Sequence, residues 1–531
     1  MIRKTPKPIQ DWNHLPQGDD MTSAHTNHAR SLAPLLALLF ILGLAGCGEP
    51  MDGTSGGIET TPDAHHHAGH SHGEFHGDWA PDHPHFEECM HPTGANPLQR
   101  TDHVVAVQEP AAPSDGTWPV LLGGTGADKA TALALDPDGR VVVGGTMRDT
   151  FTLGDETLEA TVVGGDTAFT MSFEPNGAPA WSGVIGSSNG HTHLDDLAIC
   201  PTGRVIACGG KQKPLTHGDI VEAEGEHGIY VAEWKPDGTP SWLHVFEGGM
   251  NTRCGGMAIE HSFDLESVGH TVAAFVHEGR LNLVRISHDG TLEYHETHGH
   301  GLKLPAPHVS AVQGVSTDSK GGVWVAGMFM GGGERSVGGD ALTATGTSAV
   351  FLARYDIETG EHLWSNSWGS PAEYSVVGFD RATDITGIGE VVFISGVSLP
   401  GIDFGMGALG GLPDGNKGVG FIAAFDLGGT PLWSWVPADD DGEALSTART
   451  LASTPDDHLA VLLGDHLMRL DPSDGWVHGL EPISSGAQAM VIDEDGMAVL
   501  AYELYNTSSF GEWELSSAGH ADIVIDRVEL P

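Results

Sequence analysis

The sequence predicts an all-β fold, a seven-bladed β-propeller whose ring is closed by pairing between its N- and C-terminal strands. Three observations lead to this prediction. A short phrase recurs along the chain, each copy leads into an apolar stretch, and one copy precedes the first full unit while the last unit, ending at Pro531, lacks its own. A ring whose last sheet borrows a strand from the other terminus has this arrangement.

The recurring phrase is, in most copies, an acidic residue or Asn followed by Gly, a short spacer and an aromatic residue. Its copies are DGTW (115–118), NGAPAW (176–181), DGTPSW (237–242), DGTLEY (289–294), TGEHLW (359–364) and GGTPLW (428–433). The aromatic residues lie about 52 to 70 residues apart. A short, degenerate unit from residue 434 to about 476 and a last unit to residue 531 bring the total to seven.

The first unit shows the expected strands. ATALALD (130–136) alternates, RVVVGGT (140–146) returns after a Pro-Asp-Gly turn, and DTAFTMSFE (166–174) and APAWSGVI (178–185) flank a Pro-Asn-Gly turn. Four short strands joined in this way form one antiparallel blade. In the last unit ADIVIDRVEL (521–530) aligns with a third strand, so the fourth strand is expected from residues 116–122.

The span from about Asp102 to Pro531 resembles the bacterial seven-bladed SBBP β-propeller repeat. The resemblance is carried by GGTGADKATALALDPDGRVVVGGT (123–146) and GGDTAFTMSFEPNGAPAW (164–181). It implies the propeller fold and an extracytoplasmic setting. It implies no catalytic residues, because the repeat carries none.

The charge balance excludes one class of partner. The 531 residues include 24 Lys and Arg against 72 Asp and Glu, a formal net charge of −48. Phosphate backbones are repelled by such a protein, so we expect no nucleic-acid partner, and the protein is expected to be a monomer. The 75 Gly and 31 Pro residues favour many short strands over long helices.

The N-terminus has the pattern of an export signal. Residues 32–46 form a short apolar stretch that follows Arg30 and ends in small residues before Cys47. Leu44-Ala45-Gly46-Cys47 resembles the bacterial lipobox, which implies that Cys47 is acylated and becomes the mature N-terminus. Gly48 favours the outer membrane by the same resemblance, on either its periplasmic or its exposed side. An ordinary secretory signal is the alternative, and Met21 is an alternative start.

These patterns divide the chain into residues 1–46 (signal peptide), 47–101 (a disordered, His-rich tether) and 102–531 (propeller). The tether has little apolar periodicity, and no Lys or Arg occurs between Arg30 and Arg100. Imidazole and thiolate groups without competing cations suit Zn²⁺, Cu²⁺ or Ni²⁺; the alternative is a soluble spacer. The candidate ligands are His65, His66, His67, His70, His72, His76, His83, His85, Cys89 and His91.

The cysteines of an exported chain are in an oxidising setting. In the aligned blades Cys208 ends a second strand and Cys254 opens the first strand of the next blade, on the same face. We therefore expect a disulfide between Cys208 and Cys254. Cys200 lies at the opposite end of its strand and is expected to be free.

Loops on one face of the propeller suggest a cation site near the axis. They carry GHTHLDD (190–196), HETHGH (295–300) and ADDDGE (438–443). The candidate ligands are His191, His193, Asp195, Asp196, His298 and His300, for a transition metal or Ca²⁺; the alternative is solvated loops. GSSNG (186–190) matches G-x-S-x-G but lies between blades, which argues against a hydrolase.

The sequence thus favours a lipid-anchored, non-enzymatic propeller of the cell envelope that binds a ligand or a protein or glycan partner. Two alternatives remain at this point. One is a metal-scavenging or metal-buffering lipoprotein that uses the tether, and the other is an enzyme with a metal site on the propeller face.

Overall fold

The computed structural model describes residues 118–531 except 154–155, 163, 188, 223–224, 251, 261–268, 303–310, 332–333, 372–378, 411–417, 440–443, 446 and 512. The chain divides into two compact units, Met1–Ala80 and Pro81–Pro531, and every described residue belongs to the second. The predicted signal peptide, Cys47 and the tether lie outside the described residues, as do both predicted domain boundaries, so these remain predictions.

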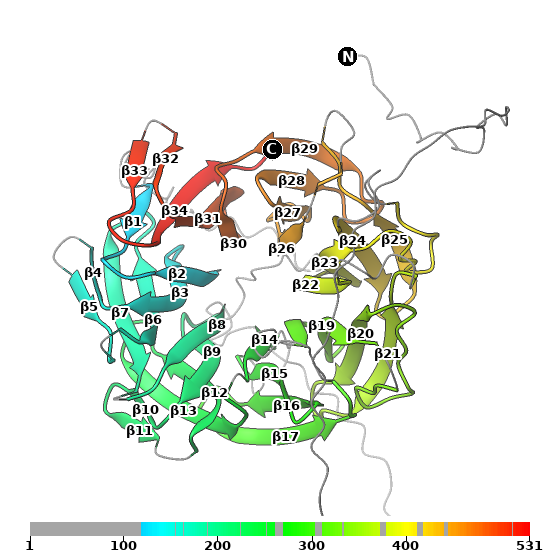
Figure 1. The fold of residues 1–531 in the computed structure, drawn as a ribbon, viewed down its shortest axis with the longest axis horizontal. Helices are drawn as coiled ribbons and strands as arrows, with labels where there is room; N and C mark the ends of the chain where they lie inside the picture. The colour runs from blue at the N-terminus through cyan, green and yellow to red at the C-terminus, as the bar shows by residue number, and fades with distance from the viewer. Residues whose placement is uncertain are drawn as a thin grey trace, which may run out of the picture. The chain divides into compact units, whose positions relative to one another are not determined.

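Seven antiparallel sheets of four or more strands, the blades, are arranged around one axis in the described unit (Figure 1). The first three blades have the following strands. Blade 1 contains β2 (Lys129–Leu135), β3 (Val141–Arg148), β6 (Asp166–Phe173) and β7 (Pro179–Gly186); blade 2 contains β8 (Thr192–Ile199), β9 (Val205–Gln212), β12 (His227–Trp234) and β13 (Pro240–Glu247); blade 3 contains β14 (Cys254–Ile259), β15 (Thr271–His277), β16 (Arg280–Ile286) and β17 (Leu292–His298).

The remaining blades repeat this order, with the first strand innermost and the fourth outermost. Blade 4 contains β18 (Val312–Thr317), β19 (Gly322–Met330), β20 (Ser348–Asp356) and β21 (His362–Trp368); blade 5 contains β22 (Arg381–Ile388), β23 (Val391–Ser398), β24 (Val419–Asp426) and β25 (Pro431–Trp435); blade 6 contains β26 (Ala448–Ser453), β27 (Leu459–Leu463), β28 (His466–Leu470) and β29 (Val477–Pro482). Blade 7 contains β30 (Ala487–Ile492), β31 (Met497–Leu504), β34 (Asp522–Glu529) and β1 (Val120–Leu122).

The ring is closed by the N-terminal strand, as the repeat arithmetic predicts. β1 pairs antiparallel with β34, so that Val120 lies opposite Ile525 and Leu122 opposite Ile523. The innermost strands contact one another in cyclic order, and β30 of blade 7 contacts β2 of blade 1. The seven-bladed propeller with terminal strand closure is therefore confirmed.

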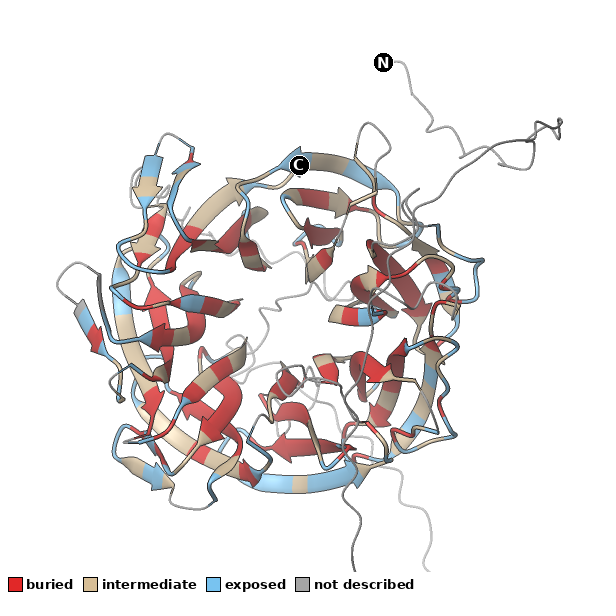
Figure 2. Cartoon of the chain, in the orientation of Figure 1, coloured by how far each residue is buried: buried red, intermediate tan, exposed pale blue. Residues whose placement is uncertain are grey.

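The hydrophobic core is divided among the blade interfaces. Each of the seven interfaces has its own cluster of buried residues, including the closing one, where Val120 and Leu122 of β1 pack with Phe169 of blade 1 and Ile523 of blade 7. Second and third strands are buried almost throughout, whereas outermost strands such as β17 are largely exposed (Figure 2). Burial on both faces explains why the second and third strands are continuous apolar runs rather than alternating ones.

Three hairpins lie between second and third strands, and the sequence analysis does not predict them. They are β4–β5 (Thr150–Leu153 and Glu156–Glu159), β10–β11 (Leu215–His217 and Ile220–Glu222) and β32–β33 (Thr507–Phe510 and Trp513–Ser516). β10 also pairs with β7 of the preceding blade, which joins an insertion of blade 2 to the sheet of blade 1.

The recurring phrase connects neighbouring blades near their outer edges. The aromatic residue of one phrase lies against the glycine of the next, and that glycine has a positive φ. At Gly238, with φ 80°, a Cβ atom would lie 2.7 Å from Cγ of Trp181. Five such contacts occur among the described residues: Trp181 with Gly238, Trp242 with Gly290, Tyr294 with Gly360, Trp364 with Gly429 and Trp433 with Gly475. We call them the aromatic–glycine contacts.

The described residues form strands, bridges and turns without a helix. Accordingly, no helix in this part of the chain has the length and apolar character needed to cross a membrane.

The aromatic–glycine contact predicts a stability difference between two glycines. Gly238→Ala should destabilise the propeller by about 2 to 4 kcal/mol, because it adds left-handed strain of about 1 kcal/mol and overpacking of about 1 to 3 kcal/mol. Gly496 is the matched control: its φ is 78° and no atom lies within 4 Å of a Cβ placed there. Gly496→Ala should lose only the strain component in denaturant unfolding. Equal losses in the two variants would contradict the proposed role of the contact.

Candidate functional site

The residues predicted to form a cation site on the propeller face do not come together. His193 lies on β8, an innermost strand, and His191 directly precedes that strand. His298 ends β17, the outermost strand of blade 3, and His300 follows it and bridges to Ser336. The prediction that these histidines meet near the axis is wrong, because loop position along a blade determines the face on which a residue lies but not its radius.

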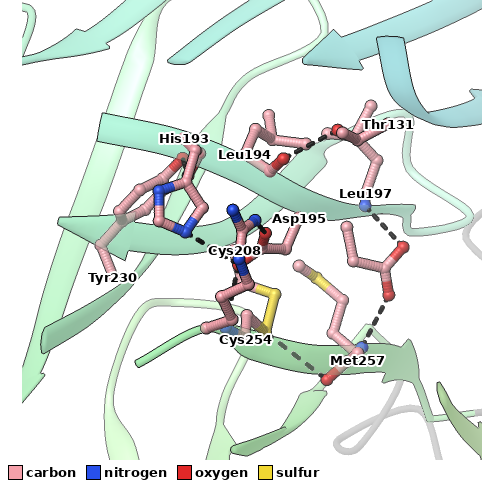
Figure 3. Close-up of a disulfide and its surroundings, with 12 residues drawn as sticks. Thr131, His193, Leu194, Asp195, Leu197, Cys208, Tyr230, Cys254 and Met257 are labelled. Carbon is pink, nitrogen blue, oxygen red and sulfur yellow. Dashed lines mark hydrogen bonds and ion pairs between the residues drawn. A yellow bond between two sulfur atoms is a disulfide. The ribbon is translucent and has the colours of Figure 1, made fainter. Parts of the chain in front are cut away.

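Asp195 and Asp196 have structural partners instead. Asp195 accepts from Arg253 Nη1 (2.6 Å) and from the backbone N–H of Cys254 (3.0 Å), and Asp196 accepts from the backbone N–H of Met257 (2.8 Å). Both side chains therefore reach blade 3 from adjacent positions on β8 (Figure 3). Among the described residues no group of three or more His, Cys, Asp or Glu side chains could hold a metal ion.

A β-bulge explains how two consecutive side chains point to the same neighbour. The pairing of β8 with β9 shifts between Leu194 and Asp196, which leaves Asp195 as an extra residue. The same shift occurs in the innermost strand of every blade. The extra residues, which we call the bulge ring, are Thr131, Asp195, Gly255, Gln313, Thr383, Arg449 and Gln488.

Four bulge-ring side chains, those of Thr131, Asp195, Thr383 and Arg449, connect their blade to the next. Thr131 Oγ1 donates to the carbonyl of Leu194 at 2.7 Å (Figure 3), and Thr383 Oγ1 donates to the carbonyl of Ala448. Arg449 Nη1 donates to Gln488 Oε1 at 2.8 Å. These contacts fix the innermost strands relative to one another, so the ring axis is surrounded by a defined set of polar groups.

Asp384 in blade 5 repeats the arrangement of Asp196 in blade 2. Its carboxylate accepts from the backbone N–H groups of Ile385 and Leu451, both at 2.8 Å. Burial raises the pKa of Asp196 to about 6, and burial together with the charge of Asp196 raises the pKa of Asp384 to about 7. Both side chains are nevertheless partly exposed to solvent.

The disulfide predicted from the aligned strands is present. Cys208 and Cys254 are bonded, with their Cα atoms 5.9 Å apart and 46 residues between them in sequence (Figure 3). Cys208 lies in the middle of β9 rather than at its end, and Cys254 is the first residue of β14. The bond therefore joins blades 2 and 3 beside the contacts of Asp195. Cys200 is free and buried.

Positive charge gathers where the innermost strands begin. Three basic residues occupy equivalent positions, two residues before the bulge residue of their blade: Lys129, Arg253 and Arg381. A fourth, Arg449, is itself a bulge residue. We call Lys129, Arg253, Arg381 and Arg449 the axial basic cluster. Their equivalent positions in parallel-running innermost strands place them at one end of the ring axis.

The four members of this cluster differ in their partners. Lys129 Nζ lies 2.9 Å from Glu503, and Arg253 contacts Asp195 as described above. His193 joins the second pair, with Nε2 at 3.5 Å from Asp195 Oδ2, and burial lowers its pKa. Partial desolvation by the surrounding strands, and then the charge of Arg449, lower the pKa of Arg381, although its side chain keeps contact with solvent. This end of the axis can bind an anion through charge-assisted hydrogen bonds.

The bulge ring and the axial basic cluster were not predicted from the sequence. A sequence signal was nevertheless present. Each innermost strand contains a four-residue pattern: an apolar residue, the bulge residue, one further residue and a second apolar residue. The seven copies are ATAL (130–133), LDDL (194–197), CGGM (254–257), VQGV (312–315), ATDI (382–385), ARTL (448–451) and AQAM (487–490). Strand alternation hides the pattern, because the bulge shifts the alternation by one residue.

No protein-family model matches the chain, and no curated protein sequence matches it. Among solved structures, the Pan2 WD40 domain of Neurospora crassa is similar over 75% of this chain and 89% of that chain, with 12% identity and a TM-score of 0.42. BamB from Moraxella catarrhalis is similar over 75% of this chain and 83% of that chain, with 14% identity and a TM-score of 0.34. The Cps50 (Swd1) β-propeller domain of Myceliophteria thermophila is similar over 77% of this chain and 99% of that chain, with 10% identity and a TM-score of 0.39.

The raised pKa values of Asp196 and Asp384 predict that stability falls as pH rises from about 4 to 7. In this window the folded state binds protons that the unfolded state has released, because an unfolded Asp titrates near 3.8. Each carboxyl contributes a slope of at most about 1.4 kcal/mol per pH unit, lessened by its contact with solvent. Replacing both by Asn should flatten this slope in denaturant unfolding measured at several pH values.

Asp289 provides the control for this experiment. Hydrogen bonds from Ser287 and Thr291 lower its pKa to about 2, so it titrates below the window. Asp289→Asn should leave the slope between pH 4 and 7 unchanged. An unchanged slope in the Asp196→Asn/Asp384→Asn variant would show that other groups cause the dependence.

Proposed function

We propose that this protein is a lipid-anchored binding module of the bacterial cell envelope, with a propeller of the SBBP type that takes a ligand or partner at the axial end. The structural observation behind the proposal is that bulge-ring residues and the axial basic cluster, contributed by different blades, lie at the same end of the innermost strands. Rigidly held polar groups from several blades provide a preorganised surface for recognition. We assign the module no catalytic step.

The proposed location depends on the N-terminal sequence. The lipobox-like Leu44-Ala45-Gly46-Cys47 supports acylation of Cys47, and Gly48 supports sorting to the outer membrane. Two or three acyl chains anchor a protein stably, since each buried CH₂ contributes about 0.8 kcal/mol. Residues 47–101 would then connect the lipid to the propeller.

Acylation predicts that Cys47→Ala abolishes lipid attachment. The variant should keep the unmodified precursor mass in mass spectrometry and incorporate no labelled fatty acid, because it lacks the thiol that accepts the acyl chains. Cys89→Ala is the matched control and should still carry the lipid. A Cys47→Ala protein that still carries lipid would exclude this anchor.

A second function, divalent transition-metal binding, is supported by the composition of the tether. Nine of the 31 histidines lie between residues 65 and 91, and this stretch contains no Lys or Arg. Neutral imidazoles are good ligands for Zn²⁺, Cu²⁺ and Ni²⁺. In this proposal the lipoprotein buffers or scavenges metal with the tether, independently of the propeller.

The metal proposal predicts that replacing the nine tether histidines by Asn removes bound metal. Elemental analysis of the purified full chain after Zn²⁺ loading and dialysis should show metal in the wild type, little in the variant, and loss of metal below about pH 6 as imidazoles become protonated. The control replaces His191, His193, His298 and His300 by Asn and should keep its metal. Metal that disappears only in the control variant would move the site to the propeller.

A further inference from the structure

Arginines in this acidic protein usually contact carboxylates. Arg285 lies within ion-pair distance of Glu260, Glu293 and Glu358, and Arg354 contacts Asp318. Arg381 and Arg449 depart from this pattern: neither has a hydrogen bond or an ion pair with a carboxylate of the described part of the chain. With 72 acidic residues against 24 basic ones, two such arginines side by side require an explanation.

Arg381 and Arg449 lie on two adjacent innermost strands, β22 and β26 (Figure 1). Thr383, two residues after Arg381, donates its hydroxyl to the carbonyl of Ala448, so this side of β22 faces blade 6. The charge of Arg449 is one of the two causes that lower the pKa of Arg381. Like charges on adjacent strands repel each other, and an anion bound between them would offset that repulsion.

Arg449 is held in a fixed orientation by blade 7. Its Nη1 donates to Gln488 Oε1 at 2.8 Å, and Gln488 Nε2 in turn donates to the carbonyl of Gly486 at 3.2 Å. The two contacts fix the amide of Gln488, which can present only its oxygen to the guanidinium. Arg449 is therefore preorganised rather than free to turn toward a distant carboxylate.

One guanidinium donor of the arginine pair lacks a hydrogen-bond acceptor. Arg449 Nε is buried without a hydrogen-bond partner, which is costly for a charged group. The carboxylate of Asp384, three residues after Arg381, accepts hydrogen bonds from the backbone N–H groups of Ile385 and Leu451 rather than from an arginine. The exposed side chain of Arg381 leaves the pair accessible from solvent.

We propose that Arg381 and Arg449 form a binding site for a small oxyanion, a carboxylate or phosphate group, at the axial end of the ring. Guanidinium groups match the paired oxygens of both anions, and an oxyanion between them would offset the repulsion. The inference names the ligand chemistry of the proposed binding function and rests on that function for its biological role. The site itself is measurable without reference to the membrane anchor.

The test is calorimetric titration of the purified full chain in chloride buffer with inorganic phosphate and, separately, with succinate. Wild type should bind at least one probe saturably, and Arg381→Gln or Arg449→Gln should weaken binding about tenfold or more, because each removes charge-assisted hydrogen bonds. Arg449→Lys keeps the charge but loses the planar fork, and should weaken binding less than Arg449→Gln. The probe that binds more tightly identifies the class of anion.

Lys320→Gln is the matched control for charge. Lys320 lies in the turn that follows β18, the innermost strand of blade 4, and forms an exposed ion pair with Glu390. Its replacement removes one positive charge at the end of the innermost strands opposite to the arginine pair, and should leave the affinity for the probes unchanged. Absence of saturable binding of both probes to wild type would overturn the proposal. A loss in Lys320→Gln equal to that in the arginine variants would do so too, because it would show only nonspecific attraction.

Thermal unfolding separates binding from folding. Without added oxyanion, Arg381→Gln should unfold at the same temperature as wild type or higher, because the repulsion is relieved. With saturating phosphate or succinate, wild type should gain stability and Arg381→Gln should not. Lower stability of Arg381→Gln under both conditions, with no gain for wild type, would assign the pair a structural role. None of these readouts depends on Cys47, so failure of the anchor and failure of the anion site remain distinguishable.

Discussion

The pairing of β1 with β34 is the constraint on which the rest of the structure depends. Val120 and Leu122 complete the last sheet and also pack in the interface between blades 7 and 1. Each blade buries its faces only against its two neighbours, so one open interface would expose two apolar surfaces at once. Closure removes both exposed edges of the array and makes the seven interfaces interdependent. Any site built from side chains of several blades relies on this closure for its geometry.

Two kinds of contact hold the blades at different radii. Near the outer edge an aromatic ring lies on a glycine of the next blade, which only a residue without Cβ permits. Near the axis a bulge turns an extra side chain toward the next innermost strand. Because the contacts lie at different distances from the axis, together they oppose rotation of one blade against its neighbour. Between particular blades, the pairing of β10 with β7 and the Cys208–Cys254 disulfide add further directional restraint.

The blades, the closing strand and the Cys208–Cys254 pair could be predicted from sequence, because each depends on a local phrase repeated at a regular interval. The radius of a residue could not, and His298 was misplaced for that reason. The axial basic cluster was missed because its members are single residues, far apart in sequence, that become neighbours only through the ring. The bulge ring was in principle readable, but its extra residue breaks the alternation by which strands are recognised. The inserted hairpins occupy loops in which no repeated pattern exists.

Two sets of like charges lie on the innermost strands, a pair of carboxyls and a pair of arginines, and they differ in how their repulsion can be relieved. Asp196 and Asp384 are stabilised by backbone N–H groups and by raised pKa values, which reduce their negative charge near neutral pH. Arg381 and Arg449 cannot lose their charge in the same way, since a guanidinium stays protonated at any physiological pH. The carboxyls can relieve their repulsion by taking up protons, whereas the proposed oxyanion would relieve the repulsion of the arginine pair. An oxyanion bound there would join blades 5 and 6 and, through Gln488, blade 7, so occupancy of the site and integrity of the ring would stabilise each other.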